Sequence, residues 1–130
     1  MPDPPISVPE NRPLSEEERE LVRFVLTEGD DRARSFISQI EHAWVRARCG
    51  CGCASVDFSI DGVKPDPHDG LEQLGDDFGW LGPAGGICSV FVFALDDLLA
   101  GFDVWSVDGV ETPVELPPIE SLLKSWPGGG

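Results

Sequence analysis

The sequence has no tyrosine, one methionine and only nine lysine and arginine residues among 130. Against the nine basic residues stand 24 aspartates and glutamates, so the formal net charge is -15. A chain this acidic repels phosphate backbones and anionic lipid headgroups, which argues against nucleic acid and membrane surfaces as partners. It favours cations or basic proteins instead. No apolar run approaches the roughly 18 residues that a membrane span needs, so we expect no membrane segment.

Residues 1–10 also lack the basic start and the apolar stretch of a secretory signal. We therefore expect a cytoplasmic protein, in which the four cysteines are more often thiols or metal ligands than structural disulfides. The length of the chain corresponds to one domain, residues 1–130, with a modest core.

Helical signals are concentrated in the first third of the chain. Residues 1–13 hold five prolines and predict an extended proline-rich arm. Ser15 and Glu18 have the spacing of a capping box, and the helix that they begin is expected to end at Gly29. A second helix is expected over residues 30–43, forming a helical hairpin with the first. Its apolar positions recur at three- and four-residue spacing: Ala33, Phe36, Ile37, Ile40 and Ala43.

From residue 44 the apolar period changes to two, which is typical of strands. Strands are predicted over residues 44–49 and 55–60, joined through the glycine-cysteine segment. Residues 87–95 are the most hydrophobic stretch and predict a central strand. A turn at Asp96 and Asp97 leads into a partner strand over residues 98–107.

Two segments have weaker patterns. Residues 61–86 contain prolines, glycines and no clear period, so a long loop is expected. Residues 119–126 predict a short C-terminal helix before a flexible tail at 127–130. Together these elements predict an α+β fold, with the N-terminal helical hairpin packed on an antiparallel sheet of about four strands.

Three cysteines lie within five residues, at Cys49, Cys51 and Cys53. With Cys88, or less favourably His68, they could supply the four ligands of a structural zinc site. Alternate residues on one face of a strand stand too far apart for this, so the glycines between the cysteines must bend the chain. A reactive thiol beside Arg46 or Arg48 is a second interpretation, and small buried residues at a tight turn are a third.

Catalytic motifs are absent from the sequence. The two histidines, His42 and His68, fall on different predicted elements, and no residues next to one another in sequence form a nucleophile–base set. A hydrolase with a site in residues 61–86 is the weakest of the functional alternatives. We therefore expect a protein that is not an enzyme.

Acidic side chains beside tryptophans are the remaining functional signal. Inhibitors of basic proteins present carboxylates around aromatic anchors, because complementary charge speeds encounter and buried pairs hold the complex. The candidate partner-binding residues are Asp57, Asp76, Asp77, Trp80, Asp103, Trp105 and Asp108.

Four stretches, residues 12–18, 48–53, 55–58 and 99–106, resemble those of a group of small, acidic, uncharacterised bacterial proteins. Some of that group are similar in size and charge to immunity proteins of polymorphic toxin systems. The resemblance spans residues 11–123 and implies a bacterial protein with no catalytic residues. The expected function is a non-enzymatic, immunity-like domain that binds and neutralises a basic protein partner. The alternative is a small zinc protein that uses the cysteine cluster.

Overall fold

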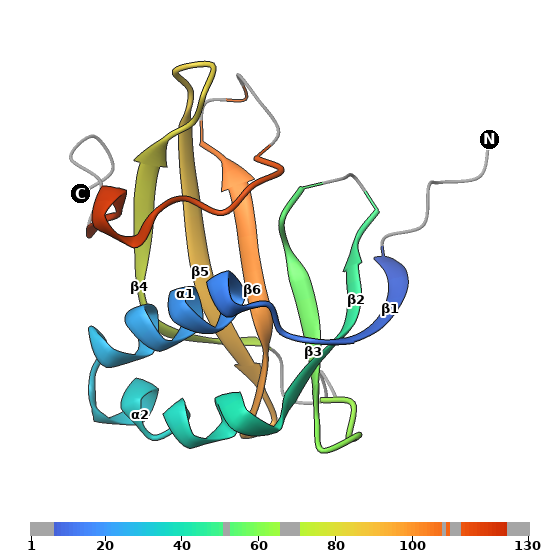
Figure 1. The fold of residues 1–130 in the computed structure, drawn as a ribbon. Helices are drawn as coiled ribbons and strands as arrows, with labels where there is room; N and C mark the ends of the chain where they lie inside the picture. The colour runs from blue at the N-terminus through green and yellow to red at the C-terminus, as the bar shows by residue number, and fades with distance from the viewer. Residues whose placement is uncertain (1–6, 51–52, 66–70, 108, 110–112, 125–130) are drawn as a thin grey trace.

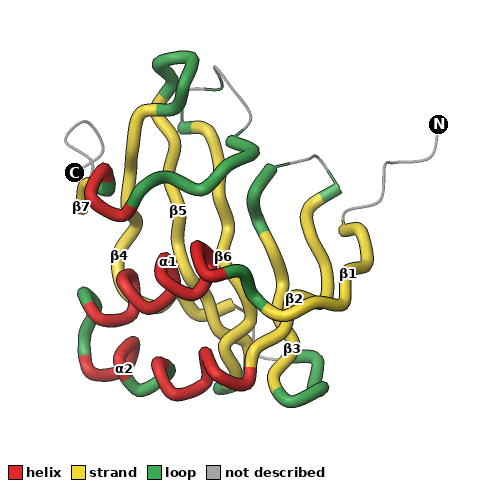
Figure 2. Tube along the Cα trace, in the orientation of Figure 1, coloured by secondary structure: helices red, strands yellow, loops and turns green. Residues whose placement is uncertain are grey.

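The computed structural model describes residues 7–50, 53–65, 71–107, 109 and 113–124. They form one antiparallel sheet in the order β1-β2-β3-β6-β5-β4-β7, with the helical segments on one side of it (Figures 1 and 2). The fold class is therefore α+β, as predicted. In chain order the elements are β1 Ser7–Pro13, α1 Glu16–Thr27, α2 Asp31–Arg34, η1 Ile37–His42, β2 Ala43–Cys49, β3 Val56–Ile60, β4 Leu71–Leu81, β5 Ile87–Leu95, β6 Leu98–Ser106, η3 Ile119–Ser121 and β7 Leu123–Lys124.

Helix α1 begins as the sequence predicts. The Ser15 hydroxyl accepts from the Glu18 backbone N–H at 3.1 Å, and the Glu18 carboxylate accepts from the Ser15 N–H at 2.8 Å. This capping box satisfies two backbone donors that a helix start leaves open. Arg12 adds a bidentate ion pair to the same carboxylate, at 2.8 and 2.9 Å, which ties the end of β1 to the first turn of α1.

The predicted second helix is wrong in extent. The structure has four α-helical residues in α2 and then the separate 3-10 helix η1. Serine at positions 35 and 38 competes with helical backbone bonding, and the Ser35 hydroxyl donates to the Arg32 carbonyl. The apolar face survives the break, since Ala33, Phe36 and Ile40 are at most 2% exposed. Burial of these side chains, rather than helix propensity, holds this segment on the sheet.

The sheet is larger than the four strands predicted. Residues 7–13, predicted as an extended arm, pair with β2 as an edge strand. Residues 71–81, predicted as loop, form β4 and pair with β5. The period of β4 is interrupted by a bulge between Leu74 and Phe78, which separates its apolar residues by four positions instead of two. At the C-terminus the predicted helix is reduced to η3, followed by the short strand β7, and the whole of the predicted tail at 127–130 lies outside the described residues.

Two hairpins match their predictions. β2 and β3 pair across the glycine-cysteine segment, and β5 and β6 pair across Asp96 and Asp97. Both aspartates of the second turn have positive φ, at 53° and 65°, as a two-residue turn of this hand requires.

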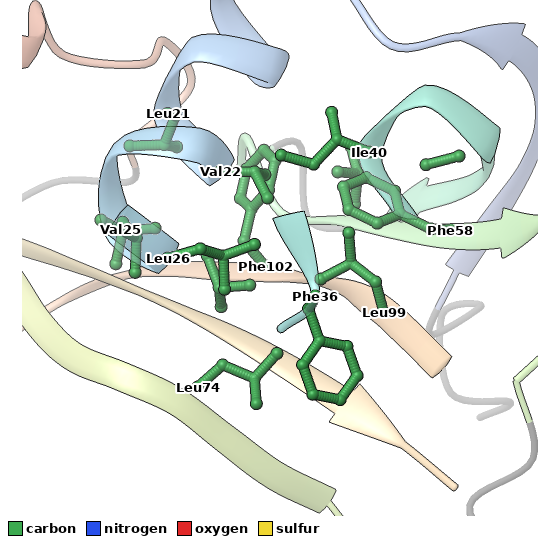
Figure 3. Packing of buried hydrophobic residues seen from close by; sticks show 14 of the residues in the cluster. Leu21, Val22, Val25, Leu26, Phe36, Ile40, Phe58, Leu74, Leu99 and Phe102 are labelled. Atoms are coloured by element: carbon green, nitrogen blue, oxygen red, sulfur yellow. The ribbon is translucent and has the colours of Figure 1, made fainter. Parts of the chain in front are cut away.

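The core lies between the helical layer and the inner face of the sheet (Figure 3). Leu21, Val22, Val25 and Leu26 of α1 pack towards side chains from the strands and from η1. The largest fully buried side chains are phenylalanines: Phe36, Phe58, Phe78 and Phe102. No helix in the described part of the chain is both long and apolar enough to cross a membrane.

Candidate functional site on the open face of the sheet

One face of the sheet carries no helix among the described residues (Figure 1). We call it the open face. Its members alternate along the strands with the residues of the core cluster, because successive side chains of a strand point to opposite sides. They are Trp44, Arg46 and Ala47 from β2, Asp57 and Ser59 from β3, Phe91 and Phe93 from β5, and Gly101, Asp103 and Trp105 from β6.

Two carboxylates lie near the centre of the open face. Asp57 is in register with Gly101, and Asp103 is two residues further along the same strand, so the two aspartates are diagonal neighbours. Burial raises the pKa of Asp57, and the charges of Arg46 and Lys64 only partly oppose it. Burial also raises the pKa of Asp103, and the charge of Asp57 raises it further, against a hydrogen bond with Ser55. Both carboxylates are therefore less well solvated than an ordinary surface aspartate.

Arg46, the arginine near this pair, is incompletely engaged. The Arg46 Nη2 atom is 3.8 Å from Asp57 Oδ2, which is beyond hydrogen-bond distance. Its Nε atom is buried and has no hydrogen-bond partner among the described residues. Asp103 makes no ion pair within the described part of the chain. Within the described ranges, the open face thus holds a carboxylate without a paired cation.

Aromatic side chains surround the carboxylates. Trp44 and Trp105 are 44% and 41% exposed, and Phe91 is half-buried and in register with Asp103. The Phe93 ring lies 6.1 Å from that of Phe91. It also covers Gly101, since a Cβ there would lie 3.2 Å from the ring.

Gly101 is required by the close approach of β3 to β6. A Cβ at this position would lie 2.2 Å from the Val56 carbonyl oxygen, far inside van der Waals contact, and its φ of 147° disfavours other residues. The space above Gly101 is bordered by the Phe93 ring and by the backbone of Asp57, at 3.2 and 3.1 Å from the position that a Cβ would take.

The structure divides the predicted partner-binding residues. Asp57, Asp103 and Trp105 lie together on the open face. Asp76 and Asp77 are exposed in the bulged part of β4 and belong to a different surface, and Asp108 lies outside the described residues.

Trp80 was predicted to contact the partner, and this is wrong. It is 5% exposed and packs in the core, in register with Cys88. Its position two residues after Phe78 places it on the same face of β4 as Phe78, and both belong to the core.

Three open-face residues, Trp44, Arg46 and Phe91, were not among the predicted partner-binding residues. Trp44 and Arg46 carried a usable signal, since they alternate with the buried Ala43 and Val45. Phe91 carried no such signal, because it lies in a continuous apolar run in which the two faces of the strand cannot be told apart from the sequence pattern.

A β-bulge in β2 places Arg48 on the opposite face of the sheet from the one that strict alternation predicts. Strict alternation places Arg46 and Arg48 on one face with Trp44, but the β2–β3 register shifts between Val45 and Ala47. Arg48 is therefore in register with Val56, a core residue, and its Nε donates to Glu10 at 2.9 Å. The bulge leaves Arg46 as the one arginine of β2 beside Asp57.

A hollow of about 580 Å³ lies beside the start of α1. Arg12, Arg48, Glu18 and Cys53 are among the residues that line it. Burial acts to raise the pKa of Glu18, but hydrogen bonds from Arg12 and from the Ser15 backbone outweigh it and lower the pKa. Since each arginine is already held by a glutamate, the charges of this hollow serve to join β1, β2 and α1.

Cys49 ends β2, and Cys53 lies shortly before β3. The Cys49 N–H donates to the Ser55 carbonyl at 3.1 Å, and Cys53 Sγ lies 3.3 Å from Ser55 Oγ. Cys88 is buried in β5, in register with Trp80 and Ser106. Within the described ranges no three His, Cys, Asp or Glu side chains are grouped to hold a metal ion, while Cys51 and His68 fall outside those ranges.

No family model, curated protein or solved structure matches this chain. The open face and the charge of the chain are therefore the features that bear on function.

Proposed function

We propose that this chain is a non-enzymatic acidic binding domain that neutralises a basic protein partner, in the manner of the immunity proteins to which some of the resembled bacterial group are similar in size and charge. It acts in the bacterial cytoplasm and requires no cofactor. The observation that carries the proposal is the pair of half-buried carboxylates, Asp57 and Asp103, set among tryptophans and Phe91 on the open face. Aromatic anchors around desolvated charge are typical of interface centres.

The net charge of -15 supports the same proposal over a longer range. A strongly negative chain steers a basic protein towards itself, and this raises the association rate at low ionic strength. The open face then supplies the short-range contacts. The acidic residues elsewhere, such as Asp76 and Asp77, add to the steering without contacting the partner.

A bait experiment in lysate of the source bacterium tests this proposal. The chain should capture a basic protein whose retention falls steeply between low and high salt. Co-expression of the chain with that protein should then suppress the growth defect or enzymatic activity that the captured protein causes alone. A captured protein that is acidic, or a basic one whose activity the chain leaves unchanged, contradicts the proposal.

The zinc alternative has no support from the described residues, because Cys88 lies in the core and no group of ligands is formed. The hydrolase alternative placed a site in residues 61–86, and much of that range is now strand β4, with Leu74, Phe78 and Trp80 in the core.

A further inference from the structure

We infer that Asp103 receives an arginine side chain of the partner, with the guanidinium group held against Trp105 and Phe91. This inference rests on the proposed function and adds the chemical identity of the central contact.

The position of Asp103 favours a cation from outside the chain. Among the described residues, Arg46 and Lys64 act on Asp57, whereas the only charge that acts on Asp103 is the carboxylate of Asp57. Phe91, across from it on β5, is uncharged. A half-buried carboxylate next to a like charge is poorly stabilised in the unbound protein. An incoming cation relieves that arrangement, and docking strengthens the pair by removing water.

The neighbours of Asp103 favour arginine over lysine. Phe91 is directly across from it on β5, and Trp105 follows two residues later on the same face of β6. A guanidinium group can donate to a carboxylate in its plane while its face stacks on an aromatic ring. The lysine ammonium is a compact, strongly hydrated charge that gains less from such a surface.

A second copy of this chain is a poor occupant of the open face. It would bring its own net charge of -15 and, across a two-fold axis, its own Asp57 and Asp103 against the same pair. Like charges placed together at an interface disfavour association. A basic partner meets no such repulsion.

Three capped tripeptides that differ only in the central side chain test the inference: acetyl-Leu-Arg-Leu-amide, the lysine analogue and the citrulline analogue. Binding is followed by NMR, through the carboxyl carbon of Asp103 and the indole N–H of Trp105. The arginine peptide should shift both signals and lower the pKa of Asp103. It should bind about two- to fivefold more tightly than the lysine peptide, the ratio expected of a cation–π contact at an exposed site. The neutral citrulline peptide should not saturate.

Matched variants identify the site. Asp103→Asn keeps the size of the side chain and should weaken arginine-peptide binding by about tenfold. Trp105→Leu should leave binding to the carboxylate but reduce the preference for arginine over lysine, because only Phe91 then remains to stack on the guanidinium group. Glu41→Gln changes the net charge equally from the exposed surface of η1, in the helical layer, and should bind like the unaltered chain. Thermal unfolding of each variant establishes that it is folded.

The outcomes separate this inference from the proposed function. Equal binding of all three peptides, or undiminished binding by Asp103→Asn, overturns the arginine site. If the basic partner is captured equally by Asp103→Asn and the unaltered chain, the proposed function stands and this site is wrong. If the arginine peptide binds at Asp103 but the chain neutralises no basic protein, the proposed function fails and the site stands. A dimer that buries Trp105 also overturns the inference.

Discussion

Replacing Asp103 with asparagine should stabilise the unbound protein. The pKa of Asp103 is raised, first by burial and then by the charge of Asp57, so its ionised form is less favourable in the folded chain than in the unfolded one. Asparagine removes the charge, keeps the shape and retains an oxygen that can accept a hydrogen bond from Ser55. A residue kept for binding can cost the unbound protein stability.

The geometry sets the size of this effect. Diagonal neighbours on adjacent strands stand about 7 Å apart, where two like charges repel by roughly 0.6 kcal/mol in water and about 2 kcal/mol at an effective dielectric constant of 20. Both carboxylates are partly exposed, and Arg46 and Lys64 offset part of the field at Asp57. We therefore expect a gain of about 0.5 to 1 kcal/mol in the free energy of unfolding near pH 7.

The pH dependence of this stability gain is a second test of its sign. Because the folded pKa of Asp103 is raised, its penalty is fully present above that pKa and disappears as the pH falls below the unfolded value of about 4. The advantage of Asp103→Asn should therefore be largest at neutral pH and vanish in acid. The same applies to Asp57→Asn with a smaller gain, because that variant also removes the ion pair with Arg46.

Urea unfolding of the two single variants and the double variant, at neutral and acid pH, measures these quantities. Glu41→Gln, which alters the net charge equally outside the open face, corrects for general repulsion. The double-mutant cycle should show that Asp57 and Asp103 destabilise one another. Destabilisation by Asp103→Asn at neutral pH, or an equal gain at both pH values, would refute the reasoning.

Three further predictions concern other parts of the chain. Gly101→Ala should cost at least about 3 kcal/mol of unfolding free energy or prevent folding, because its Cβ would lie 2.2 Å from the Val56 carbonyl oxygen. The control Gly85→Ala, also at positive φ but in open space, should cost only about 1 kcal/mol. Comparable urea midpoints for the two variants would contradict this. Glu18→Gln should lower the free energy of unfolding by about 1 to 2 kcal/mol by removing the charge paired with Arg12. Since the pKa of Glu18 is lowered, this loss should be full above about pH 4.5 and fade in acid. A cost that persists in acid would argue against the ion pair. Protein purified without added metal should contain no stoichiometric zinc by elemental analysis, and a zinc ion lost in Cys51→Ser would restore the zinc alternative.

The elements that could be predicted are those whose signals are local. The capping box of Ser15 and Glu18 lies within one turn, and the turn at Asp96 and Asp97 joins adjacent strands. Strand β4 was missed because its pairing partner, β5, satisfies its backbone while a bulge interrupts its period. The edge strand β1 was missed because its prolines favour an extended arm, and only the presence of β2 turns that arm into a strand.

The candidate site shows the same division. Asp57, Asp103 and Trp105 could be proposed from the pairing of acidic and aromatic residues, but Trp80 looked equivalent and proved to be core. The bulge after Val45 sent Arg48 to the helical side and kept Arg46 beside Asp57. A one-residue shift of this kind moves every following side chain to the opposite face of the strand. The local sequence contains no signal that predicts the shift.

The sequence by itself determined the acidity of this protein, the start of α1, the two hairpins and the α+β class, because each depends on composition or on neighbours within a few residues. Only the tertiary structure decided which face of the sheet the helices leave open, and hence which acidic and aromatic residues meet there. Asp57 and Asp103 are 46 positions apart in the chain, and they become neighbours through the pairing of β3 with β6. Long-range strand pairing depends on the fit of the whole core, so the candidate site exists only in the folded chain.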